Sequence, residues 1–172
     1  MNSKSRAQKI AVIIPTFRVA KQILTVISEI PEFVSAIYVV DDSCPEESGA
    51  VVQSACQDGR VQVLRNSSNL GVGGAVMTGY QAALQDGCSI LIKVDGDGQI
   101  DPKLIPALIA PILAGDADYT KGNRFYDLEQ ISAMPKIRLL GNALLSLMSK
   151  LSTGYWDLFD PTNGFTALSA LT

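Results

Sequence analysis

The sequence predicts an α/β protein with a mostly parallel central sheet flanked by helices. Short apolar runs alternate along the chain with segments of helical spacing, which is the pattern of strands joined by crossover helices. Hydrophobic residues make up 47% of the 172 residues and charged residues 18%, as in a folded domain with a large core. Polar clusters directly follow several apolar runs, at the strand ends where parallel sheets bind their ligands.

The predicted elements follow one another without a repeat or a low-complexity linker. The apolar runs predict strands at residues 10–14, 36–40, 61–64, 89–94 and 118–121. Apolar spacing and polar starts predict helices at about residues 18–30, 46–58, 72–86 and 102–114. We therefore expect a single domain over residues 1–172.

Composition excludes several classes of protein. The formal net charge of -3 and the pI of about 4.9 argue against a nucleic-acid-binding protein. The chain has no histidine, which excludes Ser-His-Asp and Cys-His catalysis and imidazole metal ligands. Its three cysteines have no CxxC spacing, so we expect reduced thiols and a cytoplasmic location.

Two common nucleotide-binding motifs are missing. A dinucleotide-binding fold needs its glycine fingerprint in the first turn between a strand and a helix. Here that turn is Pro15-Thr16-Phe17-Arg18, which has no glycine. The chain also has no GKS or GKT triplet, which excludes a P-loop enzyme.

The segment Asp95-Gly96-Asp97-Gly98-Gln99 directly follows the apolar run of the fourth strand. Its two carboxylates and one amide oxygen suit a hard divalent cation that keeps positions open for phosphate oxygens. The same residues also build a polar, glycine-rich turn without any metal. Both interpretations stay open at this point.

Other polar residues that follow strands also have two interpretations. Asp41 and Asp42 could bind a base or a ribose or cap the helix that follows, or one could cap the helix while the other binds the ligand. Asn69 could cap the next helix, where Gly71 allows a ligand or a neighbouring element to approach closely. Arg124, after the fifth strand, could pair with a diphosphate or a lipid phosphate, or stay solvated.

Two segments near the C-terminus are ambiguous as well. Asp157 and Asp160 flank a turn-like segment, and a carboxylate there could take a proton from an acceptor hydroxyl. Residues 137–151 have a leucine-rich helical face, which fits either the protein core or the surface of an anionic membrane. The most apolar stretch, residues 104–114, is too short to span a bilayer.

Five segments resemble the family 2 glycosyltransferases of the GT-A fold, especially the polyprenyl-phosphate branch that includes dolichyl-phosphate mannose synthase. They occur in family order and cover nearly the whole chain. They are Ile13-Ile14-Pro15-Thr16-Phe17, Val39-Val40-Asp41-Asp42-Ser43, Asn69-Leu70-Gly71-Val72-Gly73-Gly74-Ala75, Asp95-Gly96-Asp97-Gly98-Gln99 and Asp160-Pro161-Thr162-Asn163-Gly164-Phe165.

The resemblance implies a role for many of these residues. A nucleotide-sugar donor would be bound by Pro15, Thr16, Asp41, Asp42, Asn69, Gly71, Gly74, Asp95 and Arg124. Asp97 would be the principal ligand of Mn²⁺ or Mg²⁺, helped by Asp95 and Gln99. Asp160 would be the catalytic base, with Asp157 second, and Arg138 and Asn163 would contact the acceptor.

The implied reaction is the inverting transfer of one sugar from a UDP- or GDP-linked donor to a polyprenyl phosphate or a glycan hydroxyl. Family members continue beyond the position of Thr172, so we expect a catalytic domain truncated at its C-terminus. The full-length protein would lie at the cytoplasmic face of the membrane. Two alternatives stay open, a noncatalytic nucleotide-sugar-binding or assembly domain and a sugar-1-phosphate nucleotidyltransferase.

Overall fold

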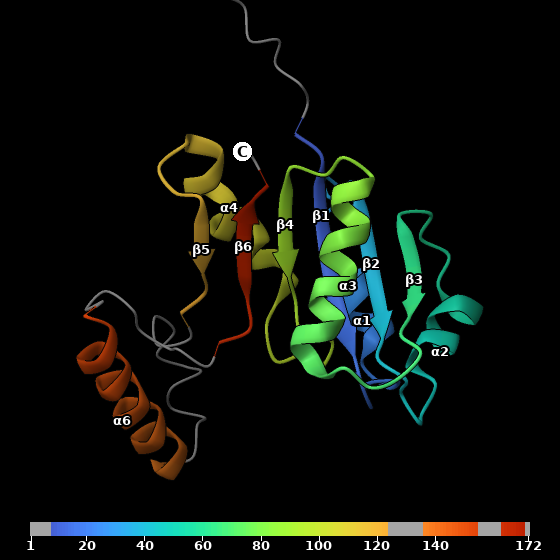
Figure 1. Ribbon diagram of the computed structural model, residues 1–172. Coiled ribbons are helices and arrows are strands. Elements are labelled where there is room, and N and C mark those ends of the chain that lie inside the picture. The colour runs from blue at the N-terminus through green and yellow to red at the C-terminus, as the bar shows by residue number, and fades with distance from the viewer. Residues whose placement is uncertain (1–7, 124–135, 155–162, 171–172) are drawn as a thin grey trace, which may run out of the picture. The chain divides into compact units, whose positions relative to one another are not determined.

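The computed structural model describes residues 8–123, 136–154 and 163–170. The strands are β1 (Ile10–Thr16), β2 (Ala36–Asp41), β3 (Val61–Arg65), β4 (Ile90–Lys93), β5 (Tyr119–Lys121) and β6 (Thr166–Ser169) (Figure 1). The helices are α1 (Ile23–Ser28), α2 (Ser48–Ala55), α3 (Gly71–Gln85), α4 (Ile105–Ala114) and α6 (Lys136–Thr153), with a short 3-10 helix η1 (Pro102–Leu104) before α4.

The five predicted strands and the four predicted helices are confirmed, but two helices begin later than their apolar pattern indicates. The residues before α1 and α2 form loops in which Arg18 and Glu47 have φ values of 60° and 50°. These left-handed conformations are incompatible with a continuous helix. The four-residue strand β6 was not predicted, because its apolar pattern is too short to be distinguished from a turn.

The sheet has the strand order β3-β2-β1-β4-β6-β5. β1 pairs in parallel with β2 and β4, and β2 pairs in parallel with β3, whereas β6 is antiparallel to β4. The chain thus runs from β1 outward to β3 and then returns to β4 on the other side of β1. Parallel sheets bind ligands beyond the carboxyl ends of the strands at such a reversal.

Both faces of the central strands β1, β2 and β4 are buried, which explains why these strands are apolar along nearly their whole length. Alternate residues of β1 belong to different core clusters: Val12 and Ile14 to one, Ala11 and Ile13 to the other. Side chains of α1, α2 and α4 complete the first cluster, and side chains of α3 complete the second.

The chain divides into two compact units, residues 1–120 with 165–172 and residues 121–164. The first unit contains β1 to β4, β6 and the helices α1 to α4, and the second contains α6. Within the described ranges, we find no helix with the length and apolar character needed to cross a bilayer.

Candidate active site

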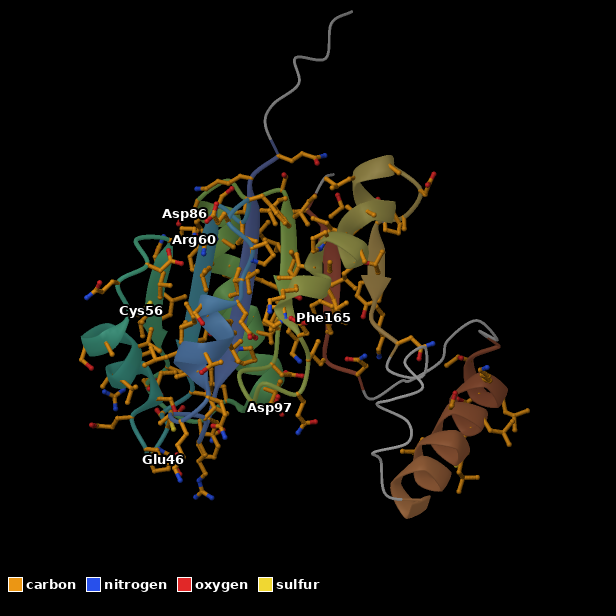
Figure 2. The ribbon with its side chains drawn as sticks, turned by 180° about the vertical axis from the view of Figure 1, so that it is seen from behind. Glu46, Cys56, Arg60, Asp86, Asp97 and Phe165 are labelled. Carbon is orange, nitrogen blue, oxygen red and sulfur yellow. The ribbon has the colours of Figure 1, made fainter. Side chains whose placement is uncertain are left out.

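A pocket of about 160 Å³ lies beyond the carboxyl ends of β1, β2 and β4. Five of the predicted site residues line it, namely Pro15, Thr16, Asp42, Asp95 and Asp97. Figure 2 shows Asp97 at the end of the strands where this pocket lies, and Asp86 and Arg60 at the opposite end of the strands. Residues that are distant in the sequence therefore meet at the strand-order reversal.

Asp42 is held rigidly in the wall of this pocket. The Asn66 side chain donates a hydrogen bond of 2.7 Å to Asp42 Oδ1, and the backbone N–H of Leu70 donates another of 2.9 Å. The Thr78 hydroxyl of α3 in turn donates to Asn66 Oδ1 at 3.0 Å. Asp42 is buried and lines the pocket, so its carboxylate can accept a hydrogen bond from a ligand hydroxyl.

The structure places Asp41 outside the lining of the pocket. Asp41 Oδ1 accepts the backbone N–H of Cys44 and Oδ2 accepts that of Gly49, both at 2.8 Å. Gly49 belongs to the first turn of α2, so Asp41 satisfies an N–H group that has no partner within the helix. The two adjacent carboxylates therefore have different surroundings: Asp41 is hydrogen-bonded within the protein, whereas Asp42 lines the pocket.

The loop after β4 brings two carboxylates to the pocket. Asp95 Oδ1 accepts a hydrogen bond of 2.6 Å from the ammonium of Lys93. Asp97 is exposed, and its Oδ1 accepts the backbone N–H of Gln99 at 3.1 Å. Gly98 has a φ of 73°, which makes the loop a tight turn as well as a candidate metal site.

The described residues contain no cluster of three or more acidic, cysteine or histidine side chains that would bind a metal by themselves. Two carboxylates at an open pocket, with Gln99 nearby in sequence, are instead an incomplete set of oxygen ligands. Mg²⁺ and Mn²⁺ fit such a set, because they retain water or bind substrate phosphates in their other positions.

The loop between β1 and α1 forms another wall and is tied to the loop after β2. Cys44 Sγ accepts the backbone N–H of Arg18 at 3.0 Å, and the Ser48 hydroxyl accepts that of Val19 at 3.3 Å. Burial disfavours the ionised Cys44 thiol, but hydrogen bonds from Ser48 and from backbone N–H groups lower its pKa overall. Arg18 and Ser43 in these loops have positive φ, a strained conformation that is common at functional sites.

Three other predicted donor-site residues shape the start of α3 and do not line the pocket. Asn69 Oδ1 accepts the backbone N–H of Gly71 at 2.9 Å, whereas Leu70 occupies the N-cap position. Gly71 has a φ of 75°. A Cβ on Gly74 would lie 2.4 Å from Leu70 Cβ, so this glycine permits close packing.

The remaining predicted residues lie near the C-terminus. Arg124, Asp157 and Asp160 fall outside the described residues, and Arg138 lies on α6 without a described side chain. Asn163 is buried, and its side chain donates a hydrogen bond of 2.9 Å to the backbone carbonyl of Gly122.

The pocket also contains residues that sequence reasoning missed. Phe17 and Val72 line it although both side chains are largely exposed, and the Arg18 guanidinium lies 5.4 Å from the Phe17 ring centroid. Phe17 could have been found as an aromatic residue directly after the first strand. Asn66 and Lys93 had no such signal, because only the fold brings them to the carboxylates they contact.

Comparison with known proteins defines first the class and then the family. Solved structures of glucosyl-3-phosphoglycerate synthase from Mycobacterium tuberculosis share this architecture. A complex of that enzyme with UDP aligns with a TM-score of 0.66 and 20% identity, over 95% of this chain and 57% of that chain. A complex with Mn²⁺, UDP-glucose and phosphoglyceric acid aligns with a TM-score of 0.68 and 19% identity.

The chain thus has the GT-A fold. It belongs to glycosyl transferase family 2, whose model matches residues 11–170.

The curated relatives extend beyond this chain. An uncharacterized protein of Methanocaldococcus jannaschii is 32% identical over 94% of this chain and 65% of its own length. UDP-N-acetylglucosamine–dolichyl-phosphate N-acetylglucosaminyltransferase of Methanococcus voltae is 28% identical, over 93% of this chain and 69% of its own. Polyprenol monophosphomannose synthase of Mycolicibacterium smegmatis is 27% identical, over 93% of this chain and 61% of its own.

Proposed function

We propose that the chain is the donor-binding part of a metal-dependent inverting glycosyltransferase. It would move a sugar from a nucleotide-diphosphate sugar to a polyprenyl phosphate or a glycan. One observation carries this proposal: Asp42, Asp95 and Asp97 converge on a single pocket beyond the carboxyl ends of β1, β2 and β4. A ribose and a diphosphate–metal complex present the hydroxyls and the positive charge that such a set of carboxylates binds.

Each wall of the pocket has a separate part in donor binding. Pro15, Thr16 and Phe17 line the side where a flat base can lie against an apolar surface. Asp42, held by Asn66 and Leu70, accepts a hydrogen bond from the base or the ribose. Arg124 remains a candidate partner for the diphosphate.

Asp97, with Asp95 and Gln99, would hold a Mn²⁺ or Mg²⁺ ion that stabilises the charge on the leaving diphosphate. The solved structures of glucosyl-3-phosphoglycerate synthase with Mn²⁺ and UDP support this proposal for the fold in general. Asp97 is the most accessible of the three pocket carboxylates. A ligand for an ion that arrives with its substrate needs this accessibility.

In the transfer itself, an acceptor oxygen attacks the anomeric carbon as the bond to the diphosphate breaks, with inversion of configuration. If the acceptor is a hydroxyl, Asp160 takes its proton, with Asp157 as the second candidate. If the acceptor is a phosphate, it has little or no proton to lose, and the same carboxylate would orient it. Arg138 and Asn163 stay proposals for the acceptor side.

The names of the relatives favour a polyprenyl phosphate as the acceptor. The exposed apolar side chains of α6 support binding at a membrane surface, where such an acceptor resides. We therefore propose that the full-length protein works at the cytoplasmic face of a membrane.

The experiment that tests this function is calorimetric titration of UDP and GDP into the protein, with Mn²⁺ and with EDTA. We expect one nucleotide to bind with Mn²⁺ and to lose its affinity in EDTA. Absence of binding by both nucleotides would contradict the proposed donor site. Binding without transfer to polyprenyl phosphate in the full-length protein would instead favour the noncatalytic alternative. Turnover of a sugar 1-phosphate with a nucleoside triphosphate would favour the nucleotidyltransferase.

Asp97→Ala should weaken Mn²⁺-dependent nucleotide binding at least about tenfold and leave the fold intact, because an exposed carboxylate is lost from the metal site. The matched control is Asp101→Ala, four positions further along the chain, where the exposed side chain accepts the backbone N–H of Lys103. Titration of both variants is the measurement. If Asp97→Ala bound the nucleotide with wild-type, Mn²⁺-dependent affinity, the assignment of Asp97 as a metal ligand would be wrong.

A further inference from the structure

Lys93 lies beside the donor pocket and has no part in the function described so far. It is the last residue of β4, two positions after Leu91, which packs in the core cluster on the α3 face. Alternate residues of a strand share a face, so the Lys93 side chain leaves the sheet on the side of α3. In the antiparallel pair of β4 and β6, Lys93 is opposite Thr166.

The ammonium of Lys93 forms a partly buried ion pair with one of the two metal-site carboxylates. Lys93 Nζ lies 2.6 Å from Asp95 Oδ1, and the two side chains are 13% and 33% exposed. This is a charge-assisted hydrogen bond in a partly desolvated place, which fixes the carboxylate more firmly than a surface pair does. Asp95 Oδ2 is not used in this pair.

Asp97 has a different environment. Among the residues that the structure describes, no ion pair includes Asp97, and its Oδ1 accepts only an exposed backbone N–H. The two carboxylates of one short motif thus differ in charge compensation: Asp95 is paired with an ammonium and Asp97 is open to a cation.

We infer that Lys93 is a positioning residue that separates the functions of Asp95 and Asp97. By pairing with Asp95, Lys93 fixes one carboxylate in the pocket wall and leaves Asp97 as the main charge that attracts the divalent ion. This inference rests on the proposed function, since it assigns different roles to two carboxylates, Asp95 and Asp97, of the same donor site. It concerns a residue outside the motif itself.

The inference has a measurable electrostatic consequence. Asp95, Asp97 and Lys93 together carry one net negative charge, whereas Asp95 and Asp97 without the lysine carry two. Loss of the ammonium should therefore strengthen the attraction for a divalent cation and free Asp95 Oδ1 to bind it. If Lys93 had only a structural role, its replacement would weaken metal binding. The sign of the change in Mn²⁺ affinity therefore distinguishes the electrostatic role from a structural one.

The test measures Mn²⁺ binding by electron paramagnetic resonance, with and without the nucleotide that binds in the calorimetric experiment. The variants are Lys93→Met and Lys93→Gln, which remove the charge, and Lys93→Arg, which retains it. We expect both neutral variants to bind Mn²⁺ about tenfold more tightly than the wild type and Lys93→Arg to stay near the wild type. In an Asp95→Asn background, Lys93→Met should keep only the part of this effect that comes from the removed charge, because no Asp95 carboxylate is left for it to free.

Each outcome decides a separate point. If the wild type binds Mn²⁺ and the neutral variants bind it equally or more weakly, the inference about Lys93 is overturned and the donor site stands. The same holds if Lys93→Met has its full effect without the Asp95 carboxylate. If the wild type binds neither Mn²⁺ nor a nucleotide, the proposed function fails, and this inference fails with it.

Discussion

Single residues of one type behave differently here because their neighbours differ. Asp41 and Asp42 are adjacent, yet Asp41 accepts two backbone N–H groups at the start of α2 and Asp42 lines the pocket. The three cysteines differ in the same way. Cys44 and Cys88 are buried, and Cys56 is partly exposed.

The burial of the cysteines predicts their reactivity. Burial raises the pKa of the Cys88 thiol, while hydrogen bonds lower that of Cys44 against the effect of burial. Cys44 is nevertheless only 2% exposed, so a reagent cannot reach it in the folded protein. With Ellman's reagent we expect one fast thiol, absent from Cys56→Ser, and three in denaturant. Two fast thiols would contradict this expectation and show that Cys44 or Cys88 becomes accessible in the folded protein.

The lowered pKa of Asp58 predicts how the stability of the protein depends on pH. A hydrogen bond from the Arg60 guanidinium lowers the pKa of Asp58, although partial burial opposes this. A lowered folded-state pKa means that the stabilisation is complete above the unfolded value of about 3.9 and is lost as the pH falls through the folded value. Because both side chains are a quarter exposed, the pair contributes only about 1 kcal/mol.

Urea unfolding of Asp58→Asn measures this contribution. The variant should be less stable than the wild type at pH 7, and the difference should shrink as the pH falls below about 4. Asp116→Asn, which alters an exposed carboxylate, is the control. A difference that stays constant down to pH 3 would contradict the assignment to this ion pair.

At the scale of elements, α3 connects the core to the pocket. Its first turns provide Val72 and Ala75 to the pocket lining, and Thr78 holds Asn66 behind Asp42. Further along, Gly79 faces the sheet, where an added Cβ would lie 2.5 Å from Ile13 Cγ2 and 3.1 Å from Val40 Cγ2. The depth at which α3 packs on β1 and β2 therefore depends on this glycine.

Two alanine substitutions in α3 test this contact. Gly79→Ala should lower the free energy of unfolding by about 1–3 kcal/mol, because the helix must move away from the sheet. Gly73→Ala is the matched control in the same helix, since its Cβ would meet nothing within 4 Å. It should gain up to about 1 kcal/mol through lower chain entropy when unfolded. Equal effects in urea unfolding would contradict the packing argument.

At the scale of the whole molecule, the two compact units differ in character. The unit of residues 1–120 and 165–172 contains most of the sheet, its core and the pocket beyond β1, β2 and β4. The other contains α6, in which Leu144, Leu145, Leu147, Met148 and Leu151 are exposed. α6 has three basic residues and no acidic residue, which suits an anionic surface.

Membrane binding is the prediction that belongs to this scale. The protein should bind vesicles that contain anionic lipid, and less so at high salt. Leu144→Glu with Met148→Glu should lower the partition coefficient at least about tenfold, because two exposed apolar side chains on one helical face are lost. Thr153→Glu, on the opposite face, is the control in a vesicle sedimentation assay. Equal loss in the control, or no vesicle binding by the wild type, would contradict a membrane role for α6.

The sequence by itself determined the fold class and the region of the site, because both depend on local patterns. Alternating apolar runs and helical spacing predict a parallel sheet, and polar residues after the strands mark its ligand-binding edge. Only the tertiary structure decided which of Asp41 and Asp42 faces the pocket, and that Lys93 pairs with Asp95. It also decided that β6 lies antiparallel between β4 and β5. These features depend on strand register and on contacts between distant segments, which the local pattern of residues does not specify.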